Sequence, residues 1–181
     1  MRKVAIIGKA GTSGNAPWRD TEWEIWGMPW ISCPRVTRLF DVHTQECWEK
    51  SVKLKDEDWI DMYRSEYADV PVYCDPSRSH VFINPVSFPF EEIRTTLPFY
   101  YLENSIAYEL ALAIHEGVDE IGLWGIHMFG SGEYIEERPS VTYLIGLAQG
   151  RGIKVTIAPG SPLFMSCNVA GRYGLPGGKR F

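Results

Sequence analysis

Residues 104–128, NSIAYELALAIHEGVDEIGLWGIHM, contain a helix pattern followed directly by a strand pattern. Apolar residues recur at helical spacing within Ile106–His115, and the Asn-Ser pair before them is typical of a helix start. Gly117 ends the predicted helix. The apolar run within Glu120–Met128 then predicts a buried strand.

The same order returns in the next part of the chain. Glu133–Gly150 has the spacing of a second helix, and Ile153–Ile157 predicts another strand. Helices and strands that alternate with short joints are typical of βαβ units in a parallel, doubly wound sheet. The second half of the chain therefore predicts an α/β protein.

Shorter apolar runs in the first half supply further strands. Val4–Gly8 is a continuous apolar run that ends in glycine, which predicts a buried parallel strand feeding a loop at its carboxyl end. Helical spacing runs through Gln45–Tyr67. The other predicted strands are Glu24–Met28, Arg38–His43 and Val72–Cys74.

Two segments have weaker patterns. Residues 75–103 are rich in proline and lack a long periodic run, so we predict an irregular excursion that forms a lid or a wall. The glycine-rich tail Gly171–Phe181 is predicted to be mobile or to lie across a surface. The prediction for residues 1–181 is a single Rossmann-like domain with a mostly parallel sheet flanked by helices.

Composition narrows the class of protein. Of the 181 residues, 45% are hydrophobic and 23% are charged, which is typical of a globular domain. The net charge of −5 argues against bulk binding of nucleic acid, which usually needs a basic surface. The four cysteines lack the CxxC spacing of a zinc site, so no metal is predicted.

The chain shows no membrane or secretion signal. Its apolar runs are too short to span a bilayer, and the start MRKVAIIGKAG lacks a signal-peptide pattern. We therefore expect a cytoplasmic protein without structural disulfides. Five of the seven tryptophans fall within the first 48 positions, and such side chains suit a ligand cleft or a protein interface as well as a core.

The loop after the first predicted strand is the first candidate binding site. Ligands of open α/β sheets lie beyond the carboxyl ends of the strands, where backbone amides of a glycine-rich loop can surround an anion. The spacing here matches neither GxGxxG nor the P-loop, so hydride transfer and Walker-type ATP hydrolysis lose support. A plain glycine-rich connection is the alternative. The candidate ligand-binding residues are Gly8, Gly11, Thr12, Ser13 and Asn15.

Further candidates lie at the starts of two predicted helices and at the end of the strand between them. The pair Asn104-Ser105 either caps its helix or binds a phosphate with the first amides of that helix, and Ser105 is the candidate ligand-binding residue of the two. His127 follows the strand in EIGLWG, where an imidazole suits general acid–base catalysis or a hydrogen bond to a ribose hydroxyl. Glu133, Tyr134 and Arg138 come next, with Arg138 suited to a phosphate. The alternative for these charged residues is an acidic first helical turn.

His43 closes the third predicted strand, two residues after Asp41 on the same face. The pair is either a catalytic base with the carboxylate that orients it, or a hydrogen bond at the sheet edge. His43, His127 and Glu133 are thus the candidate catalytic residues.

Several segments together resemble a known family. The segments VAIIG, EIWG, RLFDVH, the long block at 104–128 and EYIEERPSVTYLIGLAQGRGIKV resemble small, phage-encoded Rossmann-like proteins of poorly defined function. More distantly, the strand end resembles the motility accessory factor and hydroxymethylpterin diphosphokinase-like group, which is similar to sialyltransferase-type glycosyltransferases. That resemblance implies a nucleotide-activated donor. This chain also departs from the pattern of that group, because the group usually has Asp where this chain has His127.

These observations favour an enzyme of nucleotide or nucleotide-sugar chemistry, of the group-transferase class. The alternatives are a non-catalytic nucleotide-sequestering protein and an interaction module built on the tryptophan-rich first third. The expected partner is a small nucleotide-type ligand, with no further cofactor implied and a homo-oligomer left open. If the chain is phage-encoded, its place is the host cytoplasm.

Overall fold

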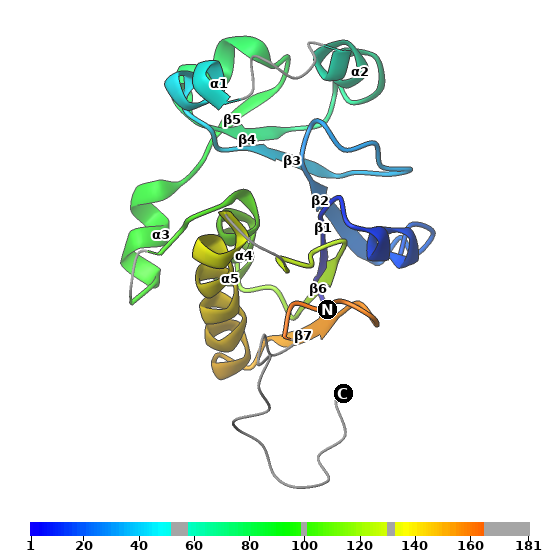
Figure 1. Cartoon of the computed structure of the whole chain (residues 1–181), viewed down its shortest axis with the longest axis vertical. Helices are drawn as coiled ribbons and strands as arrows, with labels where there is room; N and C mark the ends of the chain where they lie inside the picture. Colours follow the sequence, from blue (N-terminus) through cyan, green and yellow to red (C-terminus); the bar gives the residue numbers. More distant parts are fainter. Residues whose placement is uncertain (52–57, 99–100, 130–132, 165–181) are drawn as a thin grey trace, which may run out of the picture.

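The computed structural model describes residues 1–51, 58–98, 101–129 and 133–164. These residues form one seven-stranded sheet in the order β5-β4-β3-β2-β1-β6-β7, in which every neighbouring pair runs parallel. The chain moves outward from β1 to β5 and then returns to place β6 on the other side of β1 (Figure 1). This is the predicted Rossmann-like α/β architecture. The strands are β1 (Lys3–Ile7), β2 (Trp23–Gly27), β3 (Arg38–Asp41), β4 (Val72–Cys74), β5 (Pro85–Ser87), β6 (Glu120–Trp124) and β7 (Lys154–Ile157).

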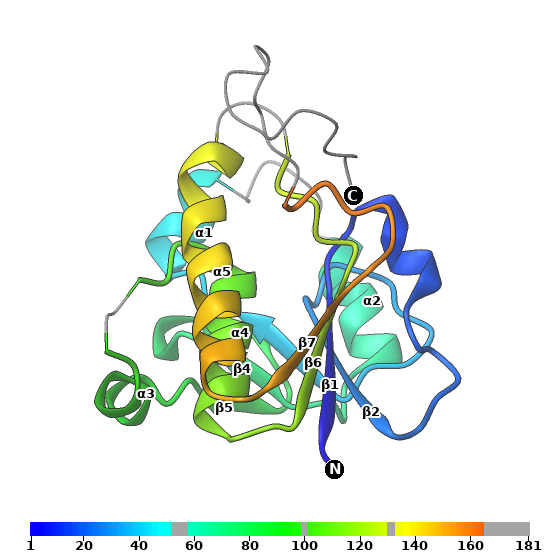
Figure 2. The same ribbon diagram turned by 90° about the horizontal axis from the view of Figure 1, so that it is seen from below.

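Helices cover both faces of the sheet (Figure 2). The longest two, α4 and α5, lie side by side on one face, where α3 also packs against α4. The short helix η1 follows β1 on the opposite face, beside the first strands. The helices are α1 (Gln45–Ser51), α2 (Asp58–Glu66), α3 (Phe90–Thr96), α4 (Ser105–His115) and α5 (Glu133–Gly150), with 3-10 helices η1 (Gly11–Asn15) and η2 (Pro76–Val81).

The alternation of β1 explains the two layers. Val4 and Ile6 belong to the core cluster that contains the buried faces of α4 and α5. Ala5 and Ile7 belong to a cluster on the other face, with Trp23 and Ile25 from β2. Successive side chains of a strand point to opposite faces, so a strand that is apolar on both faces is buried between two layers. The continuous apolar run of β1 thus follows from its central position.

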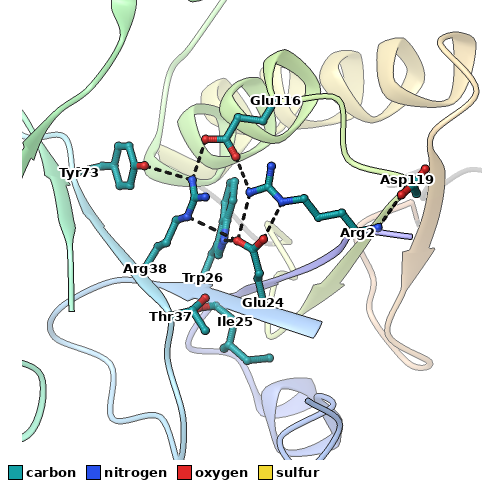
Figure 3. A network of polar contacts seen from close by, with 9 residues as sticks. All are labelled: Arg2, Glu24, Ile25, Trp26, Thr37, Arg38, Tyr73, Glu116 and Asp119. Carbon is teal, nitrogen blue, oxygen red and sulfur yellow. Dashed lines mark hydrogen bonds and ion pairs between the residues drawn. The ribbon is translucent and has the colours of Figure 1, made fainter. Parts of the chain in front are cut away.

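A network of charged side chains joins the amino ends of the central strands to the end of α4 (Figure 3). Arg2 donates to Glu24 Oε1 and to Glu116 Oε2, each at 2.6 Å. Arg38 donates to Glu116 Oε1 at 2.7 Å, and its Nε lies 3.5 Å from Glu24 Oε2. Two arginines therefore alternate with two glutamates at the amino ends of the strands, opposite the end of the sheet that carries the candidate site.

The structure corrects the prediction for residues 75–103. This segment contains η2, the edge strand β5 and helix α3, rather than an irregular excursion. β5 is only three residues long. Its proline is the first residue of an edge strand, a position where proline is tolerated. The segment predicted as one helix at 45–67 contains α1 and α2, and residues 52–57 between them lie outside the described part.

The remaining bounds are close to the predictions. β4 and α5 span the predicted residues, whereas β6 ends at Trp124, short of the predicted Met128. The tail 171–181 lies outside the described residues. Among the helices that are described, none combines the length and the apolar character that a membrane span requires.

Candidate functional site

A cavity of about 700 Å³ lies at the carboxyl ends of β1, β2, β3 and β6, beside the start of α4. In open α/β sheets this is where ligands bind, at the point where the strand order reverses. Here that point is β1, which has β2 on one side and β6 on the other. The cavity volume falls within the range of about 300–1,000 Å³ that is usual for small-molecule sites.

The floor of the cavity depends on two glycines. A Cβ on Gly8 would lie 2.4 Å from the carbonyl oxygen of Gly125, and a Cβ on Gly125 would lie 2.1 Å from that of Gly8. Gly125 also has φ +69°, a conformation that favours glycine. The amide of Gly8 donates to Trp124 O at 2.8 Å, and the amide of Ser13 donates to Ala10 O at 2.9 Å. The amides of Gly8 and Ser13 are therefore used in hydrogen bonds within the fold. Glycine at position 8 permits the close approach of the loops after β1 and β6.

His127 reaches the cavity from the loop after β6. Its Nε2 lies 3.1 Å from the hydroxyl of Thr12, in η1. The same hydroxyl accepts a hydrogen bond from the amide of Gly125 at 2.9 Å. Thr12 thus connects the loop after β1 to the loop after β6, and it positions the His127 ring without lining the cavity itself.

His43 reaches the cavity from the loop after β3. Its Nδ1 lies 2.7 Å from Asp41 Oδ1, so the two residues that the sequence placed on one face are in contact. Arg78, from η2, donates to the other oxygen of Asp41 from Nε at 3.1 Å and from Nη2 at 3.0 Å. Asp41 and Arg78 are both completely buried, whereas 30% of the His43 side chain is exposed. Trp30 packs beside the imidazole, with ring centroids 5.5 Å apart.

The start of α4 forms another wall. The side-chain oxygen of Asn104 accepts from the amide of Ala107 at 3.0 Å, which is the predicted helix cap. The side-chain nitrogen of Asn104 donates to Glu137 O at 3.2 Å and to Ser140 Oγ at 3.3 Å, which ties α4 to α5. Because Asn104 supplies the cap, the neighbouring Ser105 remains at the first helical position and lines the cavity.

The structure brings together part of the predicted site. Gly8, His43, Ser105, His127 and Tyr134 all line the cavity. The side chain of Glu133 lies outside the described part of the chain. Gly11, Thr12, Ser13, Asn15 and Arg138 do not line this cavity. Thr12 and Ser13 are nevertheless joined to cavity residues, because the Thr12 hydroxyl contacts His127 and the Ser13 amide donates to Ala10 O.

Other cavity residues had no signal in the sequence. Trp30 comes from the loop after β2 and Tyr108 from the first turn of α4, and both belong to patterns that core packing explains equally well. Arg78 lies in the segment predicted to be irregular, so nothing near it indicated a buried partner for Asp41.

The charges around the cavity have both signs. Lys9 is the one lysine or arginine among the lining residues that are described, and Glu103 and Glu137 are also in the lining. Nearby, burial and the negative charges of Asp41 and Asp75 raise the pKa of the Cys74 thiol to about 11, so this cysteine stays protonated at neutral pH. In the part of the chain that the structure describes, no three His, Cys, Asp or Glu side chains gather as metal ligands would.

Comparison with known proteins reveals similarity of fold. No protein-family model and no curated protein matches the chain. The sialyltransferase CstII from Campylobacter jejuni, solved with the substrate analogue cytidine-5'-monophosphate, superposes with a TM-score of 0.55 and 13% identity, covering 90% of this chain and 82% of that chain. CstII with CMP-3FNeuAc gives 0.53 and 14%, with 90% and 83% covered. The predicted likeness to sialyltransferase-type proteins is confirmed for the fold, and the phage-encoded family stays a prediction.

Proposed function

We propose that the chain is a glycosyl-type transferase that binds a nucleotide-activated sugar in the cavity at β1. The observation that carries this proposal is the cavity itself, at the switch point of a sialyltransferase-like fold and with two histidines in its wall. The structural neighbours were solved with CMP and a CMP-sugar. A cytidine nucleotide is therefore the first ligand to test.

The start of α4 is the proposed phosphate subsite. The first amides of a helix have no partner within the helix, and the helix dipole favours an anion there. Ser105 and Ile106 stand at this position and line the cavity, and Asn104 accepts from the amide of Ala107 in the same turn. Lys9 adds a positive charge to the same cavity. The nucleotide phosphate would then lie between α4 and the loop after β1.

Aromatic side chains would hold the base and the sugar. Trp30, Tyr108, Phe129 and Tyr134 line the cavity, and Phe129 and Tyr134 are 49% and 38% exposed. Exposed aromatic faces at the mouth of a cavity suit stacking against a nucleobase. Of the two histidines, one would accept the proton of the sugar acceptor during transfer.

The tryptophan-rich interaction module has less support. Trp23 and Trp26 are buried in the core, and Trp30 forms part of the cavity wall. Trp18 and Trp48 are only partly exposed. A protein interface would need such side chains on the surface. The non-catalytic nucleotide binder remains the second candidate, because it needs the same cavity.

Titration calorimetry with CMP, CMP-sugars and the other nucleoside monophosphates tests binding, and release of CMP in the presence of sugar acceptors tests transfer. We expect CMP to bind, and a CMP-sugar to be consumed at a rate that the double variant His43→Asn/His127→Asn loses. Binding of CMP without turnover of any CMP-sugar would support the sequestering protein instead. If none of the nucleotides binds, the proposed function is wrong.

A further inference from the structure

Asp41 stands between a buried arginine and a cavity histidine. We propose that His43 is the group that accepts the proton of the sugar acceptor. Asp41 and Arg78 are positioning residues that keep Nε2 of His43 unprotonated and facing the cavity. This proposal rests on the proposed transferase function. It gives the two histidines of the cavity different roles, which their positions in the sequence do not distinguish.

The hydrogen bonds of Asp41 fix the tautomer of His43. Arg78 occupies Oδ2 with two N–H donors, and the backbone amide of His43 donates to Oδ1 at 3.3 Å, so both oxygens of Asp41 already act as acceptors. A carboxylate only accepts hydrogen bonds, and Oδ1 faces His43 Nδ1 at 2.7 Å. The proton of the neutral ring must therefore be on Nδ1. Nε2 keeps its lone pair, and among the described residues none hydrogen-bonds it.

Two further side chains hold the guanidinium of Arg78 in its position beside Asp41. Its guanidinium lies 4.4 Å from the ring centroid of Trp48, in α1. Its Nη1 donates to Gln45 Oε1 at 3.3 Å. A buried ion pair is a weak source of stability, because the loss of hydration offsets most of the attraction. A buried arginine that holds a buried aspartate against a cavity histidine is better explained by control of that histidine.

His127 lacks this control. Its Nε2 contacts the Thr12 hydroxyl, which is uncharged and can donate or accept. That contact allows either tautomer and supplies no negative charge for an imidazolium. We therefore assign His127 to ligand binding and His43 to proton transfer.

The transfer step balances without a co-reactant. The oxygen of the acceptor hydroxyl forms a bond to the anomeric carbon of the sugar, and its proton moves to His43 Nε2. The bond between the anomeric carbon and the phosphate oxygen breaks, and its electron pair stays on the nucleoside monophosphate. The imidazolium is stabilised by Asp41 until it releases the proton to water.

The first test reads the tautomer and needs no substrate. Long-range ¹H–¹⁵N spectra of the wild-type protein, recorded with the ring neutral, should show His43 protonated at Nδ1. In Asp41→Asn, the new amide must turn its oxygen toward the donors of Arg78 and its NH₂ toward His43. His43 should then accept at Nδ1 and carry its proton on Nε2. An Nε2–H tautomer in the wild-type protein would overturn the proposal even if the variant failed to fold.

The second test compares the two histidines as a matched pair. His43→Asn should lower turnover of a CMP-sugar by about 10²–10⁴ and leave the CMP affinity within a few-fold, as expected for a proton acceptor. His127→Asn should mainly weaken CMP. Arg78→Lys keeps the charge but loses the fork, so turnover should fall with an unchanged KM and a mixture of His43 tautomers.

The outcomes separate the two levels of the proposal. Absence of CMP-sugar turnover in the wild-type protein would overturn the transferase function and, with it, the role of His43. Turnover that survives His43→Asn but not His127→Asn would overturn the role of His43 alone.

Discussion

Glu109 is a carboxylic acid in the interior of the protein. It lies in α4, it is completely buried, and neither of its oxygens has a partner among the described residues. Burial raises the pKa of Glu109 well above its ordinary value, because the charged form would lose its hydration. The folded protein therefore holds this side chain neutral, at a cost in stability.

We expect Glu109→Leu to stabilise the protein, and the gain to grow with pH. Below about pH 4 the gain is that of removing an unsatisfied buried group, about 1–3 kcal/mol. Above the ordinary pKa of a glutamate the unfolded chain releases a proton that the folded protein keeps. The wild-type protein thus loses about 1.4 kcal/mol per pH unit until the folded pKa is reached.

Urea unfolding of both proteins between about pH 5 and pH 8 measures this difference. A gain that is constant across the range would mean that Glu109 does not titrate on unfolding. A loss of stability in the variant would mean that the carboxyl has a structural partner.

For single residues, the sequence predicted which residue types would be used better than it predicted which side chains they contact. It indicated that His43 and Asp41 share a face, because strand geometry brings residues two apart together. It could not indicate Arg78, whose contact with Asp41 spans 37 positions and depends on where the folded chain places η2. It also assigned Gly8 to an anion, whereas its amide donates to Trp124 and its missing side chain makes room for Gly125.

The charged network at the amino edge of the sheet acts between elements. It connects β1, β2, β3 and the end of α4 through Arg2, Glu24, Arg38 and Glu116 (Figure 3). Burial alone would raise the pKa of Glu24. The hydrogen bonds from Arg2 and Trp26 and the charges of both arginines outweigh burial, and the pKa of Glu24 is lowered. The carboxylate therefore stabilises the fold where it is ionised.

The sign of this effect is opposite to that of Glu109. A carboxylate with a lowered pKa contributes stability above the unfolded value of about 4.3, and the contribution is lost as the pH falls below it. We expect Glu24→Gln to cost about 1–2 kcal/mol at pH 7 and to cost little in acid, near pH 3. Glu22→Gln is the control, because the Glu22 side chain is 70% exposed and pairs with Lys3 at the surface, so its loss should be within about 0.5 kcal/mol. Equal losses in both variants, measured by denaturant unfolding, would contradict this role.

Elements were predictable where a long pattern existed. α4 and α5 are long enough for periodic apolar positions, and Asn104 marks a start by its capping side chain. β5 has three residues and is not buried in the sheet, so no apolar run marks it. It becomes a strand because β4 offers an unpaired edge, which is a tertiary cause.

For the whole molecule, the alternation of helices and strands predicted the parallel sheet, and the crossover rules limited its topology. The cavity could not be predicted in the same way. Its walls come from loops after four strands and from the start of α4, and these meet only after the sheet has formed. Local patterns therefore indicated where ligands bind in such folds, and the structure supplied which side chains face the ligand.

A ligand that bridges these loops should stabilise the entire fold. At a concentration of about 100 times its Kd, CMP should raise the free energy of unfolding by about 2.7 kcal/mol. Core amides of β1, β6 and α4 that exchange only through global unfolding should then exchange about 100-fold more slowly. Ala10→Trp places a large side chain at the cavity wall and should abolish both this protection and the rise in Tm. Ser65→Trp, on the exposed surface of α2, should keep both. If CMP protects Ala10→Trp as well as the wild-type protein, the nucleotide binds elsewhere, and the cavity at β1 is not the site.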